Sequence, residues 1–131
     1  EKTLRAVSNY FNKADIKMTC DDFENVLKNA SKRDFVYLDP PYDPLSDTAS
    51  FTEYDRAGFD SEEQIRLSQV CHKLNERGIR FLLSNSATPF IMDLYKGKDY
   101  RVEIIKARRA VNARGDGRGD VEEVLVRNFD L

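Results

Sequence analysis

The chain has 131 residues, which allow one small domain, and 40% of them are hydrophobic, enough for a core. The formal net charge of −2 gives no overall nucleic-acid signature, so any nucleic acid would have to be gripped locally. No apolar run approaches the roughly 20 residues of a membrane span, and no basic-then-apolar signal segment opens the chain. The two cysteines, Cys20 and Cys71, fall in candidate core elements and are interpreted as small buried hydrophobic residues. A reducing, cytoplasmic setting follows.

The first third of the chain predicts two helices and a short strand. Residues 1–13 place Leu4, Val7 and Phe11 on one helical face. Residues 14–19 are assigned to a short strand. Asp21 or Asp22 can then cap a second helix. Its apolar residues keep helical spacing: Phe23, Val26, Leu27 and Ala30.

The most informative stretch is the apolar run Phe35 to Leu38, followed by Asp39-Pro40-Pro41-Tyr42. The run predicts a strand buried on both faces, as in a parallel sheet. The two prolines lack backbone N–H groups, so ladder pairing stops there. Asp39 and Tyr42 are therefore expected at the carboxyl end of a strand, where open α/β sheets place their ligands. The plain alternative is a strand end closed by a proline turn.

A long segment, residues 43–58, separates this strand from the next helix and is interpreted as a loop that closes over a ligand. Ser61-Glu62-Glu63-Gln64 predicts a capping-box start, and Gly78 predicts the end of that helix. His72 falls on its polar side and is interpreted as solvated. Residues 79–83 are the next predicted strand.

Ser84-Asn85-Ser86 is interpreted as a second strand-end loop that borders the pocket. Thr88 and Pro89 then open a helix that Gly97 closes. Residues 100–105 and 121–129 predict an antiparallel strand pair, because their connection is too short for a crossover helix. That connection is basic.

Asp-Pro-Pro-Tyr, together with Ser84-Asn85-Ser86 and the segments Pro44-Leu45-Ser46, 50–54 and Gly58-Phe59 in this order, resembles Dam-type (D12 class) DNA adenine-N6 methyltransferases. The resemblance runs from about Cys20 to Phe129. It implies an α/β fold: part of a Rossmann-like sheet, mostly parallel, with a C-terminal antiparallel strand. Residues 1–131 would form the C-terminal catalytic part of the enzyme.

The implied reaction transfers a methyl group from S-adenosylmethionine to adenine N6 in double-stranded DNA after the base has left the stack. Asp39 and the Pro40 carbonyl would accept the two N–H bonds of the amine, and prolines are suited because only a carbonyl is required. Pro41 belongs to the same catalytic tetrapeptide, and Tyr42 would stack on the base. No metal is needed.

The resemblance also implies binding residues. Asp22, Phe23 and Asp39 would contact the cofactor, although Asp22 fits an ordinary helix cap equally well. The DNA-binding candidates are two loop aromatics, one strand-end amide and four arginines: Phe51, Tyr54, Asn85, Arg108, Arg109, Arg114 and Arg118. Incidental surface aromatics and a merely solvated hairpin tip are the alternatives.

The glycine-containing turn that holds the cofactor's methionine end in this family has no counterpart in the chain. An upstream half of the same methyltransferase is therefore an expected partner, and the chain alone is expected to be inactive. Three alternatives remain open: a methyltransferase for cytosine N4, RNA or protein glutamine; a non-catalytic DNA-binding module; and a module that binds a protein partner.

Overall fold

The structure is a computed structural model that describes residues 1–45, 59–108 and 120–130. Its elements in chain order are α1 (Lys2–Lys13), α2 (Phe23–Lys28), β1 (Phe35–Leu38), α3 (Ser61–Glu76), β2 (Arg80–Ser86), α4 (Pro89–Tyr95), β3 (Arg101–Arg108) and β4 (Asp120–Arg127). None of the described helices is long and apolar enough to cross a membrane.

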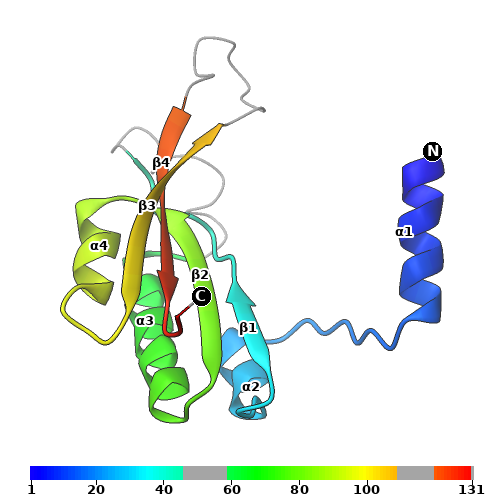
Figure 1. Cartoon of the computed structure of the whole chain (residues 1–131), viewed down its shortest axis with the longest axis horizontal. Coiled ribbons are helices and arrows are strands. Elements are labelled where there is room, and N and C mark those ends of the chain that lie inside the picture. Colours follow the sequence, from blue (N-terminus) through cyan, green and yellow to red (C-terminus); the bar gives the residue numbers. More distant parts are fainter. Residues whose placement is uncertain (46–58, 109–119, 131) are drawn as a thin grey trace.

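The four strands form one mixed sheet in the order β1-β2-β4-β3 (Figure 1). β1 and β2 run parallel, with Leu38 opposite Leu83. β4 runs antiparallel to both of its neighbours, β2 and β3. The predicted α/β class and the antiparallel C-terminal strand are confirmed, and that strand lies inside the sheet rather than at its edge.

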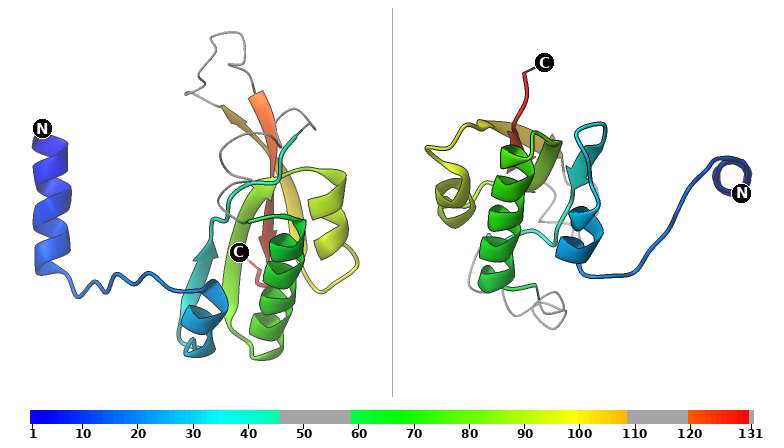
Figure 2. Two further views of the ribbon diagram at one scale, coloured as in Figure 1. Left: turned by 180° about the vertical axis from the view of Figure 1, so that it is seen from behind. Right: turned by 90° about the horizontal axis from the view of Figure 1, so that it is seen from below.

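One face of the sheet carries the helices α3 and α4, and α2 lies beside β1 (Figure 2). The buried core joins these layers: Leu67, Val70, Cys71, Leu74, Ile79, Phe81, Leu83, Ile91, Tyr95, Val124 and Val126. Because side chains alternate along a strand, Phe81 and Leu83 of β2 reach the core and Leu82 points to the opposite face. Burying each such side chain contributes about 1.5–3 kcal/mol.

The exposed side chains of β1 correct the sequence prediction. Phe35 and Tyr37 are 53% and 57% exposed, whereas Val36 and Leu38 are half-buried against the core. The run was expected to be buried on both faces, but β1 is an edge strand of the described sheet, and no described helix covers its second face.

α1 stands apart from the rest of the molecule and is joined to it by an extended segment (Figures 1 and 2). The predicted apolar face is present, but Leu4, Val7 and Phe11 are all exposed. The strand predicted over residues 14–19 is not formed, because none of the described strands lies beside this segment to pair with it. Cys20 is exposed as well, so only Cys71 meets the expectation of a core cysteine.

The helix boundaries follow local capping chemistry. Asp60, not Ser61, caps α3, since its Oδ1 accepts from the backbone N–H groups of Glu62 and Glu63 at 2.9 and 3.1 Å. Gly78 follows the helix with φ +68°, a backbone conformation that side chains disfavour, so the predicted stop is confirmed. Thr88 and Pro89 open α4 as predicted.

Candidate active site

The site forms just beyond the carboxyl end of β1, beside the last residues of the parallel strand β2. Asp39 follows the last ladder residue of β1, Leu38, whose partner in β2 is Leu83. Asp39 is therefore next to Ser84, although the two are 45 residues apart in the sequence. Ser84, Asn85 and Ser86 were predicted as an exit loop, but they are the last residues of β2 and pair with β4. The prediction that Ser84-Asn85-Ser86 borders the segment that begins at Asp39 is nevertheless confirmed.

The Asp39 carboxylate is exposed, and within the described residues one hydroxyl holds it. The Ser84 Oγ donates to its Oδ1 at 3.1 Å, and the Tyr37 hydroxyl lies 3.1 Å from the same Oγ. Because Ser84 has one hydroxyl hydrogen, Tyr37 donates to Ser84 while Ser84 donates to Asp39. Among the described residues nothing donates to Oδ2, so this oxygen is left as an acceptor for a ligand.

Tyr42 is half-buried beside this carboxylate. Its hydroxyl donates to Oε2 of Glu123 at 3.4 Å, a long hydrogen bond from β4. Burial raises the pKa of the Tyr42 hydroxyl above its usual range, and the Glu123 and Asp39 carboxylates act in the same direction. Tyr42 therefore stays neutral at physiological pH, as a stacking surface requires.

The loop after Asp39 is fixed by hydrogen bonds to α3, β2 and α4. The Pro41 carbonyl accepts from Nε2 of Gln64 at 2.8 Å, and the Asp43 N–H donates to Oδ1 of Asn85 at 3.0 Å. The Thr88 hydroxyl donates to Oδ2 of Asp43 at 2.5 Å. No described residue donates to the Pro40 carbonyl, so the proline carbonyl beside Asp39 is open while the next one is occupied.

Asp22 and Phe23 lie at the start of α2, away from the Asp39 loop along the chain but against the same helix, α3. Asp22 caps α2 and also pairs with Arg66 at 3.0 and 2.7 Å, whose guanidinium lies 4.1 Å from the Phe23 ring centroid. The Arg66 hydrogen bonds lower the pKa of Asp22 to about 2. The helix-cap interpretation is confirmed, and the carboxylate remains partly exposed.

The structure does not place Asn85 where it could contact DNA. Asn85 is 0% exposed, and its amide bonds Gln64, Asp43 and Ser86. The predicted contact is corrected, because the strand continues through this residue and turns its side chain into the core. The Arg108 backbone ends β3. The remaining DNA-binding candidates lie outside the described residues: Phe51, Tyr54, Arg109, Arg114 and Arg118.

Sequence reasoning missed Ser84 as the partner of Asp39 and Gln64 as the partner of Pro41. The signal for Gln64 was present. Gln64 shares a helical face with Leu67, Cys71 and Leu74, and a polar residue on an apolar stripe indicates a specific buried partner.

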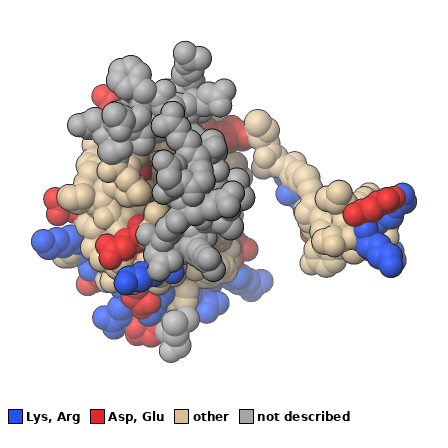
Figure 3. All heavy atoms as spheres, turned by 90° about the horizontal axis from the view of Figure 1, so that it is seen from above, with Lys and Arg blue, Asp and Glu red and all other residues tan. Residues whose placement is uncertain are grey.

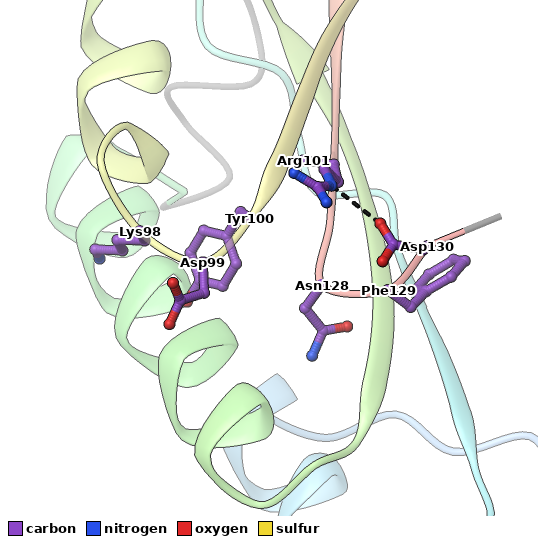
Figure 4. Close-up of a pocket in the computed structure, with 7 residues that line it drawn as sticks. All are labelled: Lys98, Asp99, Tyr100, Arg101, Asn128, Phe129 and Asp130. Atoms are coloured by element: carbon purple, nitrogen blue, oxygen red, sulfur yellow. Dashed lines mark hydrogen bonds and ion pairs between the residues drawn. The ribbon is translucent and has the colours of Figure 1, made fainter.

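A hollow of about 300 Å³ lies elsewhere, between the start of β3 and the end of β4 (Figure 4). It is lined in part by Tyr100 and by the ion pair of Arg101 with Asp130, 3.0 Å apart. None of the predicted site residues that the structure describes lines this hollow, and Asp39 is not among its lining residues. Across the described residues no group of three or more His, Cys, Asp and Glu side chains could hold a metal ion.

The described surface mixes charges of both signs. Seen from above, Lys and Arg side chains alternate with Asp and Glu along the rim of the body, and α1 carries both (Figure 3). The net charge of −2 agrees with this mixture. The described surface in this view therefore offers no broad basic patch, and a polyanion would depend on local contacts.

A strand-end carboxylate, an open proline carbonyl and a half-buried tyrosine, on a mixed sheet with an internal antiparallel strand, fit the class of α/β methyltransferases. The family of D12 class N6 adenine-specific DNA methyltransferases matches residues 1–111, and the chain belongs to it.

Named relatives agree with this family. The type II methyltransferase M1.LlaDCHI of Lactococcus lactis subsp. cremoris is 40% identical over 129 residues, covering 98% of this chain and 45% of the relative. The type II methyltransferase M.MjaIII of Methanocaldococcus jannaschii is 39% identical over 131 residues, covering 98% of this chain and 44% of the relative. The DNA adenine methylase of Escherichia coli (strain K12) is 35% identical over 107 residues, covering 82% of this chain and 38% of the relative. The chain thus spans less than half the length of these relatives.

Proposed function

We propose that this chain is the C-terminal catalytic part of a methyltransferase acting on adenine N6 in double-stranded DNA, with the target base flipped out of the duplex. The family membership supports the reaction class, and the Asp39 geometry supports the role of the site. An upstream part of the enzyme would complete it. Below, "complete enzyme" means this chain joined to that upstream part.

One observation carries the proposal. Asp39 Oδ2 and the Pro40 carbonyl are adjacent acceptors without a described donor, whereas Asp39 Oδ1 and the Pro41 carbonyl are both occupied. An exocyclic amine has two N–H bonds to donate, so the open pair matches it in number. Donating both bonds to the protein favours a pyramidal nitrogen with its lone pair directed outward.

Tyr42 supplies the remaining part of the base site. Its flat, neutral ring stands beside Asp39, and base–aromatic stacking is worth about 1–3 kcal/mol. This is comparable with the few kcal/mol needed to take a base out of the duplex. Residues Phe51 and Tyr54 would line the approach to the site, and the four arginines would hold phosphates.

S-adenosylmethionine would supply the methyl group as an electrophilic sulfonium. Asp22 suits the cofactor's adenine amine, because its carboxylate stays ionised and partly exposed despite its pairing with Arg66. Phe23 would add its backbone and ring edge. Asp39 would face the methyl group from the target side, and positioning and electrostatics would provide the rate enhancement.

Asp39→Ala in the complete enzyme tests this proposal. Transfer of tritiated methyl groups to duplex DNA containing adenine should be abolished while the fold persists, because the Asp39 side chain is exposed. Asp93→Ala, an exposed carboxylate on α4, is the matched control and should leave the activity unchanged. Retention of most activity by Asp39→Ala would rule the role out.

The same assay separates the substrates. Duplex DNA without adenine, RNA and a glutamine-containing protein should remain unlabelled by the complete enzyme. Labelling of any of these in place of adenine would transfer the proposal to that substrate.

A further inference from the structure

Two buried amide side chains link α3 and β2 to the loop that follows Asp39. Gln64 is 3% exposed and Asn85 is 0% exposed. Nε2 of Gln64 donates to the Pro41 carbonyl at 2.8 Å, and Oε1 of Gln64 accepts from Nδ2 of Asn85 at 3.1 Å. Oδ1 of Asn85 then accepts from the Asp43 N–H at 3.0 Å. The four groups form one continuous relay from carbonyl to amide.

The relay restrains the segment where the chain has least freedom of its own. The proline rings fix φ at Pro40 and Pro41, so the rotations about ψ are the main ones left between Asp39 and Tyr42. Leu38 is held in the β1 ladder on one side, and the Pro41 carbonyl is held by Gln64 on the other. The direction of the Pro40 carbonyl is thereby fixed from both ends.

The buried position explains why an amide is needed. Gln64 lies on the apolar face of α3. A hydrocarbon side chain would pack there without a polar partner, whereas a buried amide must be hydrogen-bonded. An amide donates and accepts at once, so one residue satisfies both the Pro41 carbonyl and the Asn85 amide. A buried polar chain in which every member is paired is rigid, and a broken one is costly.

We propose that Gln64 and Asn85 are positioning residues for methyl transfer, which hold Asp39 Oδ2 and the Pro40 carbonyl in register with the target amine. This inference rests on the proposed function. Neither side chain touches the substrate. Both act through the loop, and displacement of an acceptor by about 1 Å is enough to lower a rate substantially.

Steady-state kinetics of the complete enzyme carrying Gln64→Glu test the relay. An ionised Glu has no hydrogen to donate to the Pro41 carbonyl, whereas a protonated Glu restores the donor. At pH 8.5 we expect kcat to fall about tenfold or more, with KM for cofactor and DNA within about twofold of wild type. The deficit in kcat should shrink as the pH is lowered to 5.5.

Two further variants make the result specific. Gln64→Met keeps the length of the side chain without a donor, so its kcat deficit should be the same at every pH. Gln69→Glu places the same change on the exposed side of α3 and should match wild type throughout. Unchanged kcat in both Gln64 variants would overturn the positioning role. A fall in kcat accompanied by a rise in KM and a fall in Tm would overturn it as well.

Hydrogen exchange provides a readout independent of methyl transfer. The peptide 39–44 contains three prolines, so Asp39, Tyr42 and Asp43 carry its only backbone N–H groups. Gln64→Met should speed exchange in this peptide and leave α3 and β2 as protected as before. Unchanged exchange would refute the relay. Faster exchange in an enzyme that does not methylate adenine would support the relay and refute the proposed function.

Discussion

The Ser84 hydroxyl of β2 donates a 3.1 Å hydrogen bond to Oδ1 of Asp39, the first residue after β1. This contact joins the residue after β1 to the last part of the parallel strand β2, and it leaves Oδ2 of Asp39 without a donor among the described residues. The strand pairing alone would bring the residues together, but among the described residues it is the Ser84 hydroxyl that restrains the rotation of the carboxylate.

Ser84→Ala should therefore lower kcat in the complete enzyme about tenfold. A hydrogen bond to a charged group is worth about 1.5–3 kcal/mol, and part of this orients Asp39 for the reaction. Methyl transfer at saturating DNA and cofactor is the measurement. Ser86→Ala removes the same atom two residues along β2, where the hydroxyl bonds no described residue, and should keep full activity. Equal losses in the two variants would argue against an orienting role.

Tyr42 should matter through its ring more than through its hydroxyl. Tyr42→Phe gives up the long 3.4 Å bond to Glu123 and keeps the ring, so kcat/KM for DNA should stay within about threefold of wild type. Tyr42→Ala removes the stacking surface and should cost about 10- to 100-fold. Fluorescence of 2-aminopurine at the target position checks the base-flipping step. A Phe variant as impaired as the Ala variant would contradict stacking.

The Asp22–Arg66 pair should make stability depend on pH only in acid. The Arg66 hydrogen bonds lower the pKa of Asp22 from 3.8 to about 2, so the folded chain binds fewer protons than the unfolded chain between these values. The stabilisation is complete above pH 3.8 and is lost as the pH falls through about 2. Arg66→Gln should be less stable than wild type at pH 5 to 7, and the difference in unfolding free energy should shrink as the pH falls below 3.8 and through about 2.

Urea unfolding at a series of pH values measures this difference. Arg33→Gln is the control, since Arg33 is exposed and its side chain forms no ion pair with a described residue. If the difference in unfolding free energy between wild type and Arg66→Gln persists unchanged to pH 2, Asp22 is not the titrating partner of Arg66.

The two thiols should react at very different rates in this chain. Cys71 is fully buried, and burial raises the pKa of its thiol to about 12, whereas Cys20 is exposed. Because the thiolate is the reactive form, a disulfide reagent at pH 8 should label Cys20 rapidly and Cys71 only after unfolding. Rapid labelling of both in native buffer would show that the α3–β2 packing opens readily. Cys20→Ser isolates the slow thiol.

The parts of the fold that depend on local chemistry could be predicted from the sequence. The Asp22 cap, the Thr88-Pro89 start and the Gly78 stop all follow from residues within one turn, and the structure confirms them. The end of β1 at Leu38 could be predicted as well, because Pro40 and Pro41 lack the N–H groups that a strand ladder needs.

Interactions with distant segments could not be predicted in the same way. Whether Phe35 and Tyr37 are buried depends on what covers β1, and no local pattern contains that information. Asn85 resembled a strand-end residue facing DNA, but pairing with β4 extends β2 past it. The Ser84–Asp39 and Gln64–Pro41 contacts cross 45 and 23 residues. The register of β1 on β2 decides the first contact, and the packing of α3 against the loop decides the second.

The position of β4 affects the order in which the sheet can assemble. The last strand in the chain separates β2 from β3, so β3 cannot join the sheet until β4 is in place. On a ribosome, which releases the chain from its N-terminus, β1 and β2 can pair early while β3 waits for its neighbour. Because Glu123 belongs to β4, its hydrogen bond with Tyr42 forms only when β4 joins the sheet. Until then a nascent chain would carry Asp39-Pro40-Pro41-Tyr42 without this contact.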